Sequence, residues 1–284
     1  MKKITPIDPD NKLIDTIIKC IKCDPKLYEK YYTPNKIRKY DLREFLSIII
    51  DILRLGIPWR KVDKLANKGA IHWSTIYKTY VKLLKDNVIG QCLSKTIRMY
   101  LHRKPATKLK IRMTDTTTIT NKLGEENVGR NVHYKGKKIT KVSMIADKYG
   151  IPLDANIYPG NTYDSAIYLK QLDDKPLVDE KLEVKHRQIL LADKGYDSSK
   201  VRNKLIAKGF IPIIPYNKRN TKNKQKIKHL TQEQKIVYKR RILIEQTFMR
   251  LKRNRRIDIR YDRKTITYKG FVMLGILDII LKSI

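Results

Sequence analysis

Residues 109 to 115 read LKIRMTD, and apolar and polar side chains alternate along them. Alternation with a period of two places one set of side chains on each face of a β-strand, so this stretch predicts a strand that is half buried. Upstream of Leu109 the apolar residues recur at helical spacing instead. The chain therefore changes here from helices to a sheet, and the predicted strand ends on an acid, Asp115.

Four further strands are predicted downstream. They cover Lys137–Asp147, Ile151–Tyr158, Arg187–Ala192 and Phe210–Ile214, and the turn-forming sequence DKYG joins the first two. Helices are predicted from Ser165 to Leu172, after a cap at Asp164, and from Asp197 to Lys208. This order predicts a mixed α/β sheet with helices on its faces. The strand that starts at Arg187 also runs into an acid, Asp193.

The region before the sheet predicts a small helical domain over residues 1–106, followed by a second domain over residues 107–284. Its helices cover Leu13–Ile21, Phe45–Leu55, Trp59–Asn67 and Thr75–Lys85, with Asp41 and Ser74 as caps. Three helices with short turns are typical of a helix-turn-helix module, whose last helix would present Lys78 and Lys82 to DNA. A generic helical bundle fits the same pattern, and the charge of the chain favours DNA binding.

Residues 238 to 252 read YKRRILIEQTFMRLK and predict a single amphipathic helix. Offsets of three, four and seven residues return to one side of a helix, so one carboxylate is framed by a Tyr, an Arg and a Lys. These residues are Glu245, Tyr238, Arg241 and Lys252. An apolar stripe lies beside them (Val237, Ile244, Phe248, Leu251), and a basic edge that includes Arg253 suits a polyanion. The alternative is a surface helix with a solvated charged face.

The charge of the chain points to a polyanionic partner. Lysine and arginine number 63 against 28 acids among 284 residues, a net charge of +35. Nucleic acid is the first candidate for such a partner, and an anionic membrane surface is the second. The segment from Tyr216 to Lys264 alone holds 18 basic and four acidic residues. Its loop from Asn217 to Lys228 predicts contacts to DNA phosphates, or else a solvated loop.

Other features exclude several classes of protein. A hydrophobic content of 41% supports a folded core. Cys20 and Cys23 form a lone CxxC without the further ligands that a zinc site needs, so buried thiols in a reducing compartment are expected. No secretion signal opens the sequence, and Phe271–Ile284 is too short to span a bilayer. We therefore expect an intracellular protein with a C-terminal packing helix and no membrane partner.

Three acids on predicted rigid supports suit a metal site. Phosphoryl transfer by two metal ions needs carboxylates that converge on cations about 3.5–4 Å apart. Asp115, Asp193 and Glu245 are the candidates, and Mg²⁺ prefers such oxygen ligands. The rival acids have structural explanations: Asp147 lies in a turn, Asp154 in mid-strand, Asp197 at a helix cap, and Glu125 and Glu126 in a polar loop.

Four stretches together resemble insertion-sequence transposases of the DDE type, of the IS-four or IS-five kind. They are Asp115-Thr-Thr, the run from Ala192 to Ser198 (ADKGYDS), the sequence GNTYD that ends at Asp164, and Tyr238-x₂-Arg241-x₃-Glu245-x₆-Lys252. The last has the spacing of the family's Tyr-Arg-Glu-Lys signature, and the run RYDR from Arg260 to Arg263 also looks like a family stretch. The resemblance covers residues 109 to 284.

The resemblance implies a ribonuclease-H-like fold preceded by a DNA-binding domain. It implies that Asp115, Asp193 and Glu245 bind two Mg²⁺ ions, for which Mn²⁺ would substitute, and that Tyr238, Arg241 and Lys252 contact the DNA end. The expected activity is cleavage at the terminal inverted repeats of a mobile element to leave 3′-hydroxyls, then joining to target DNA by a homodimer on DNA. Only 51 residues separate Asp193 from Glu245, so the large strand-rich insertion of some relatives, and their hairpin-forming route, do not carry over.

Two alternatives come from other classes. The chain could be a DNA-binding protein derived from a transposase, without catalysis. It could also be a metal-dependent nuclease that selects a DNA structure and cuts without joining.

Overall fold

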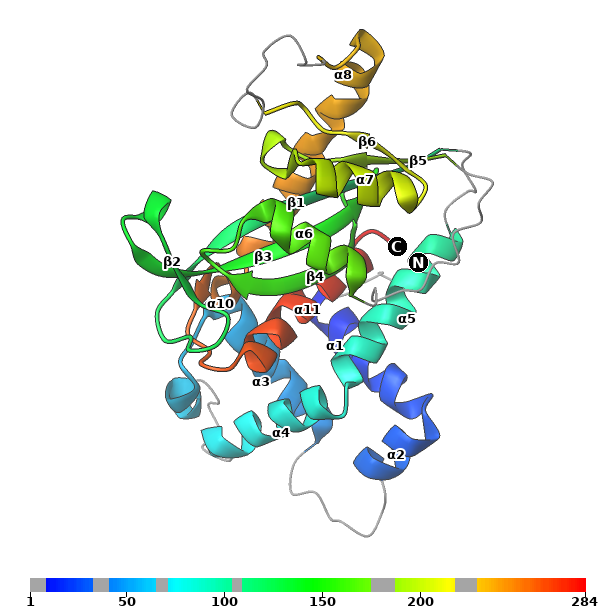
Figure 1. Cartoon of the computed structure of the whole chain (residues 1–284). Helices are drawn as coiled ribbons and strands as arrows, with labels where there is room; N and C mark the ends of the chain where they lie inside the picture. Colours follow the sequence, from blue (N-terminus) through cyan, green and yellow to red (C-terminus); the bar gives the residue numbers. More distant parts are fainter. Residues whose placement is uncertain (1–8, 33–40, 65–70, 104–108, 175–186, 218–228) are drawn as a thin grey trace, which may run out of the picture.

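A computed structural model of the chain describes residues 9–32, 41–64, 71–103, 109–174, 187–217 and 229–284 (Figure 1). The helices before the sheet are α1 (Pro9–Lys22), α2 (Pro25–Tyr32), α3 (Leu42–Leu55), the 3₁₀ helix η1 (Trp59–Lys64), α4 (Trp73–Lys85) and α5 (Val88–Arg103). They confirm that the N-terminal region is helical. The predicted domain boundary at 106/107, the end of the helix predicted to reach Asn67, and all but the first residue of the basic loop lie outside the described residues.

The sheet combines antiparallel and parallel strands. β1 (Leu109–Asn121) pairs antiparallel with β3 (Lys137–Asp147), and β3 pairs antiparallel with β4 (Pro152–Pro159). On its other side β1 pairs in parallel with β5 (Arg187–Leu191), and β5 pairs in parallel with β6 (Phe210–Ile213). The predicted mixed sheet with flanking helices is confirmed, and the order β4-β3-β1-β5-β6 is that of the expected ribonuclease-H-like fold.

β1 is longer than the sequence predicts. The expected strand ended at Asp115, which was wrong, because β3 continues to pair with β1 beyond this point. Asp115 lies opposite Met144, and Thr120 lies opposite Ile139. Two short strands were not predicted: β2 (Gly129–Asn131) pairs antiparallel with the start of β3, and β7 (Ile259–Arg260) pairs in parallel with the end of β1.

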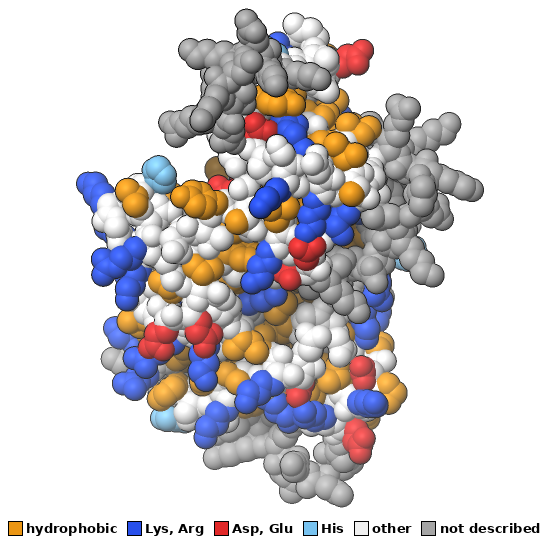
Figure 2. Space-filling model, in the orientation of Figure 1, with side chains coloured by type: hydrophobic (Ala, Val, Ile, Leu, Met, Phe, Trp, Pro, Cys, Tyr) orange, Lys and Arg blue, Asp and Glu red, His pale blue; other side chains and the backbone are white. Residues whose placement is uncertain are grey.

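Helices cover both faces of the sheet (Figure 1). α6 (Asp164–Asp173) and α7 (Ser199–Ala207) enclose one apolar cluster, which includes Tyr168, Leu190 and Phe210. The opposite face belongs to a larger core with α9 (Ile242–Lys252) and α11 (Thr265–Leu281), where Met113 and Met144 are fully buried. Strand residues therefore alternate between two cores, as their period of two requires. Over the face seen in Figure 2, basic side chains outnumber acidic ones.

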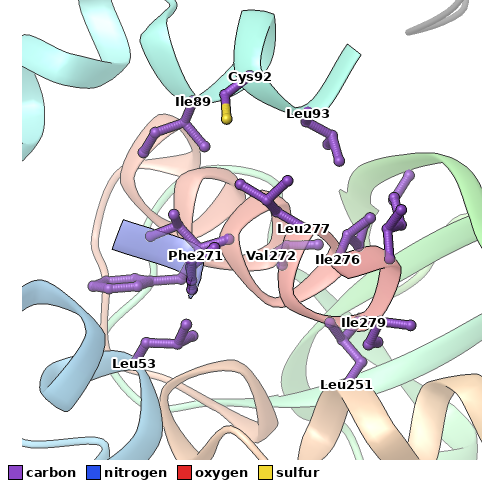
Figure 3. Close-up of a cluster of buried hydrophobic side chains, with 14 of the residues drawn as sticks. Leu53, Ile89, Cys92, Leu93, Leu251, Phe271, Val272, Ile276, Leu277 and Ile279 are labelled. Atoms are coloured by element: carbon purple, nitrogen blue, oxygen red, sulfur yellow. The ribbon is translucent and has the colours of Figure 1, made fainter. Parts of the chain in front are cut away.

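α11 joins the sheet to the N-terminal helices. Figure 3 shows its residues Phe271, Val272 and Leu277 among side chains of α5, α3 and α9, such as Ile89, Leu53 and Leu251. The predicted C-terminal packing helix is confirmed, and one continuous core runs from α1 to α11. Among the described helices, none has the length and apolar composition needed to cross a bilayer.

A buried ion pair ties η1 to the chain after α9. Arg256, on the short helix α10 (Arg255–Asp258), binds Asp262 through two hydrogen bonds of 2.9 and 3.0 Å. Arg256 also donates to the carbonyl of Ile57, and the Trp59 indole donates to Asp262 at 3.3 Å. The run from Arg260 to Arg263, which resembles a stretch of the transposase family, thus contains Asp262, the acidic partner in this buried ion pair.

Four predicted helix caps were wrong in detail. Asp164, predicted to cap its helix, is the first residue of α6, and the N-cap is Tyr163. Asp41 stands at the N-cap of α3, but its side chain makes no capping hydrogen bond. His72, rather than Ser74, caps α4, and Ser198, rather than Asp197, caps α7 through the N–H of Val201. At α7, contacts of Asp197 with Arg202 and with the N–H of Asn217 leave the capping position to Ser198.

Candidate active site

Asp115 and Asp193 come from neighbouring parallel strands. In the pairing of β1 with β5, Met113 lies opposite Leu191. Both aspartates follow two residues later, so the register carries them to the same level of the sheet. Asp193 leaves the strand there, and its Oδ1 accepts the N–H of Gly195 at 2.6 Å as the cap of a short 3₁₀ helix.

Glu245 reaches this level on the closing helix. The predicted single α-helix is instead three consecutive pieces: α8 (Gln232–Tyr238), the 3₁₀ helix η6 (Lys239–Arg241) and α9. All junction residues keep right-handed helical angles, so the chain direction continues. The predicted stripe is confirmed for Ile244, Phe248 and Leu251, which are buried, whereas Val237 is partly buried.

Arg241 lies between the first and third acids. Its Nη2 is 2.7 Å from Asp115 Oδ2 and 3.7 Å from Glu245 Oε1, and its Nη1 donates to the Tyr238 hydroxyl at 3.3 Å. Its Nε is enclosed and makes no hydrogen bond with the described residues. The Arg241 guanidinium therefore connects two other signature residues, Tyr238 and Glu245, with the aspartate of β1.

The environment of Asp115 disfavours its charge. Burial raises the pKa of Asp115 to about 6, although Arg241 and the N–H of Thr116 favour the ionised form, and the neighbouring Asp193 adds to the rise. A largely buried carboxylate next to a like charge is stabilised by a cation. In this structure that cation is Arg241.

The structure adds a fourth acid that the sequence analysis treated as a helix cap. Asp164 is the first residue of α6, and its Oδ1 accepts hydrogen bonds of 2.7 Å from Thr116 Oγ1 and from Lys141 Nζ. A Cβ placed on Gly195 would lie 2.9 Å from Asp193 Oδ1 and 3.8 Å from Asp164 Oδ2. Asp164 therefore lies beside both strand aspartates. The signal that could have found it was its place at the end of the sequence GNTYD.

The other predicted contact residues occupy two regions. Lys252 is partly buried and donates from Nζ to the Thr118 carbonyl on β1 at 2.9 Å, while Arg253 next to it is exposed. Lys78 and Lys82 are exposed on α4, at the opposite end of the molecule from α8 (Figure 1). The structure thus brings Lys252 to the strand that carries Asp115, and leaves the basic residues of α4 on a separate surface.

The rival acids all have structural partners, although Asp197 is not the helix cap that was predicted. Asp147 accepts the N–H groups of its turn and the Tyr100 hydroxyl, and Asp154 accepts from Gln171 at 2.8 Å. Asp197 binds Arg202 and the N–H of Asn217. Glu126 accepts the N–H of Thr265, and Glu125 pairs with Arg263.

The acids suit a divalent metal by type but are not gathered around one point. Three carboxylates on two strands and a helix supply the oxygen donors that Mg²⁺ and Mn²⁺ prefer. Within the described ranges, however, no three His, Cys, Asp or Glu side chains lie close enough together to hold an ion. Arg241 lies between two of them, and Glu245 is half exposed. The donor set therefore fits a metal by residue type, but in this arrangement not by position.

A ribonuclease-H-like sheet with acids on adjacent strands and on a closing helix defines a class of proteins that act on nucleic-acid phosphates. The family model for the transposase DDE domain matches residues 107–274, which is more than half of the chain. The chain therefore belongs to the DDE transposase family and is a DNA transposase. This family implies dependence on a divalent metal, and DNA as the partner.

Individual relatives are distant. The chain is 26% identical over 154 residues to the "Putative transposase for insertion sequence element IS402" of Burkholderia cepacia, which covers 54% of this chain and 67% of that protein. Among solved structures, the piggyBac transposase synaptic complex with hairpin DNA aligns with a TM-score of 0.48 and 12% identity over 98% of this chain and 75% of that one. A pre-cleavage Mos1 transpososome aligns with a TM-score of 0.25 and 11% identity over 98% of both chains. Both TM-scores are below 0.5, so the family assignment rests on the sequence match.

Proposed function

We propose that the chain binds the terminal inverted repeats of its own mobile element, cuts there to leave 3′-hydroxyls, and joins those ends to target DNA. Asp115, Asp193 and Glu245 would hold two Mg²⁺ ions, or Mn²⁺ in their place. When bound, the metal would make a water or a 3′-hydroxyl nucleophilic and stabilise the leaving oxygen. The reaction exchanges one phosphodiester bond for another and needs no nucleotide cofactor.

One observation carries this proposal: Arg241 connects the Asp115 carboxylate of β1 to the Glu245 carboxylate of α9, next to Asp193. Arg241 and Glu245 follow Asp115 by 126 and 130 positions in the chain, and the three side chains meet here with complementary charge. A surface helix with a merely solvated charged face would not place its Arg in a part-buried contact with a strand aspartate.

The chain's own residues would position the DNA, and Arg241 would exchange a carboxylate partner for a DNA phosphate. Arg241 can release Asp115 and take a phosphate, because a guanidinium binds carboxylate and phosphate with the same geometry. Its Nε, which has no partner among the described residues, then gains one. Tyr238 holds the guanidinium through Nη1, and Lys252 and Arg253 continue the cationic surface from the end of α9.

The N-terminal helices would bind DNA away from the cut. Lys78 and Lys82 project from α4, as a helix-turn-helix module requires, and residues 1–106 would form the DNA-binding unit ahead of the catalytic domain of residues 107–284. Two DNA ends must be processed together, so a homodimer on DNA is expected.

The test is cleavage and joining of a labelled duplex that carries the element's own terminal sequence, in Mg²⁺ and in EDTA. The wild type is compared with Glu245→Gln, which keeps the shape of the side chain and removes its charge. Glu233→Gln, on the exposed surface of α8, is the matched control. We expect activity only with metal, with loss in Glu245→Gln and retention in Glu233→Gln, while all three proteins bind the duplex.

Other outcomes decide between the alternatives. Equal activity of the wild type and Glu245→Gln would show that Glu245 is not a ligand. Tight binding without cutting by the wild type, unaffected by EDTA, would identify a DNA-binding protein without catalysis. Cutting without joining, even from a supplied 3′-hydroxyl end, would identify a nuclease.

A further inference from the structure

The two most exposed large hydrophobic side chains of the described residues are Val132, at 89% exposure, and Tyr163, at 81%. Single exposed hydrophobic residues are common on protein surfaces. These two, however, lie on neighbouring loops, and Tyr134, which is 47% exposed, lies on the same loop as Val132. Three exposed apolar side chains beside a functional site suggest a contact surface.

Direct contacts hold the two loops together. The side chain of Asn131 donates from Nδ2 to the carbonyl of Gly160 at 2.7 Å. Gly129 approaches the second loop so closely that a Cβ there would lie 2.0 Å from Asn161 Oδ1. The hairpin that joins β2 to β3 and the loop that leads into α6 therefore form one unit.

The hairpin tip is ordered by its own hydrogen bonds. The Asn131 side chain accepts the N–H of His133 at 2.9 Å, and its carbonyl accepts the N–H of Gly136 at 3.0 Å. Lys135 and Gly136 take left-handed angles, with φ of 54° and 68°, which close the turn tightly. A tip held in this way presents Val132 and Tyr134 outward without first losing the entropy of a free loop.

The stem of the hairpin is basic. Arg130, Lys135, Lys137 and Lys138 are all exposed, and no acid occurs between Asn127 and Ala146. Figure 1 shows the β2 hairpin projecting from the end of the sheet, and the corresponding corner of Figure 2 shows orange, blue and pale blue side chains without red. This excess of positive charge favours a polyanionic partner over an apolar partner or a protein surface with few acidic residues.

The same unit reaches the acids. Tyr163 directly precedes Asp164, whose carboxylate binds the hydroxyl of Thr116, and Thr116 in turn donates its N–H to Asp115. The backbone of Tyr163 therefore lies one residue from an acid that is hydrogen-bonded to Thr116, the residue after Asp115.

We propose that Val132, Tyr134 and Tyr163 form an apolar wedge that unstacks a base at the DNA end and stacks against it, while the basic stem binds the adjacent phosphates. Proteins commonly insert apolar side chains between base steps, and aromatic rings stack on bases of any sequence. Opening the end in this way would give the acids access to the backbone. The inference deepens the proposed function and rests on it.

The test measures base unstacking without chemistry. A terminal-repeat duplex with thymine at each of its last pairs in turn is saturated with protein in EDTA, and thymine oxidation by permanganate is mapped. We compare the wild type with Tyr163→Ala and Val132→Ser/Tyr134→Ser, and with Tyr163→Phe as the conservative variant. Ile206→Ala removes another exposed apolar side chain, on α7 at 61% exposure, and is the control. Anisotropy confirms saturation, and thermal melting confirms folding.

We expect one thymine to become reactive in complexes with the wild type, Tyr163→Phe and Ile206→Ala, and to return to the level of free DNA in the wedge variants. The preference for a frayed over a paired end should fall by about 5-fold or more in those variants, which is the lower range for losing one base–aromatic stack. Saturated wedge variants with the permanganate pattern of the wild type would overturn the proposal. If the wild type cuts and joins with Mg²⁺ but leaves every thymine protected, the wedge proposal alone is refuted. If it unstacks a base but never cuts, the proposed function alone is refuted.

Discussion

Replacing Asp262 with Asn should destabilise the fold strongly, because the substitution leaves a buried guanidinium without its counter-charge. The Arg256 and Asp262 side chains are each 2% exposed and are joined by hydrogen bonds of 2.9 and 3.0 Å. Trp59 donates to the same carboxylate. The pair therefore links η1 to the chain after α9, so its loss should loosen both.

The magnitude follows from the burial. Removing one partner of a buried ion pair costs about 3–5 kcal/mol, since the remaining charge stays desolvated. Asn keeps the shape and one acceptor of Asp262, which favours the lower end, about 3 kcal/mol. For a chain of this size each kcal/mol lowers the melting temperature by roughly 2–4 °C, so we expect a fall of roughly 6–12 °C.

Thermal unfolding followed by circular dichroism measures this effect. The control is Arg263→Gln, because Arg263 and Glu125 form a similar pair that is 71% and 65% exposed, and such surface pairs contribute about 0–1 kcal/mol. Equal melting temperatures for Asp262→Asn and Arg263→Gln would refute the reasoning. A second substitution, Arg256→Met, should recover part of the stability of Asp262→Asn, because the unpaired charge is then gone.

Three further predictions concern the site and the DNA. Gly195→Ala would push a Cβ to 2.9 Å from the Asp193 carboxylate, so strand cleavage should fall on the order of 100-fold with little change in melting temperature; an unchanged rate would show that this carboxylate need not stay in place. Arg241→Gln should raise the affinity for Mn²⁺ in the absence of DNA by about tenfold, because the substitution removes a cation that competes for Asp115. Equal or weaker Mn²⁺ binding by calorimetry would contradict the idea that a metal ion replaces Arg241 at Asp115. Replacing Lys78 and Lys82 together with Ala should reduce the salt dependence of DNA binding by about two in the log–log slope, and an identical slope would exclude phosphate contacts there.

Local pattern alone predicted much of this protein. The alternation of apolar and polar residues located β3 at Lys137–Asp147, and helical spacing located α3, α4 and the buried residues of α9. These predictions succeed because a period of two or of 3.6 decides which face of an element can be buried. The signature spacing likewise identified Tyr238, Arg241 and Glu245 as one group before any contact was known.

Only the tertiary structure decided what meets across the chain. The length of β1 depends on pairing with β3, and the choice of Ser198 over Asp197 as a cap depends on Arg202 and Asn217, which occupy the aspartate. The place of Asp164 beside the strand aspartates depends on how α6 packs. Residues far apart in sequence carry no periodic signal of their contact, because that contact is set by packing and register rather than by local backbone preference. The sequence therefore names the chemical groups of this transposase, and packing decides which of them share one site.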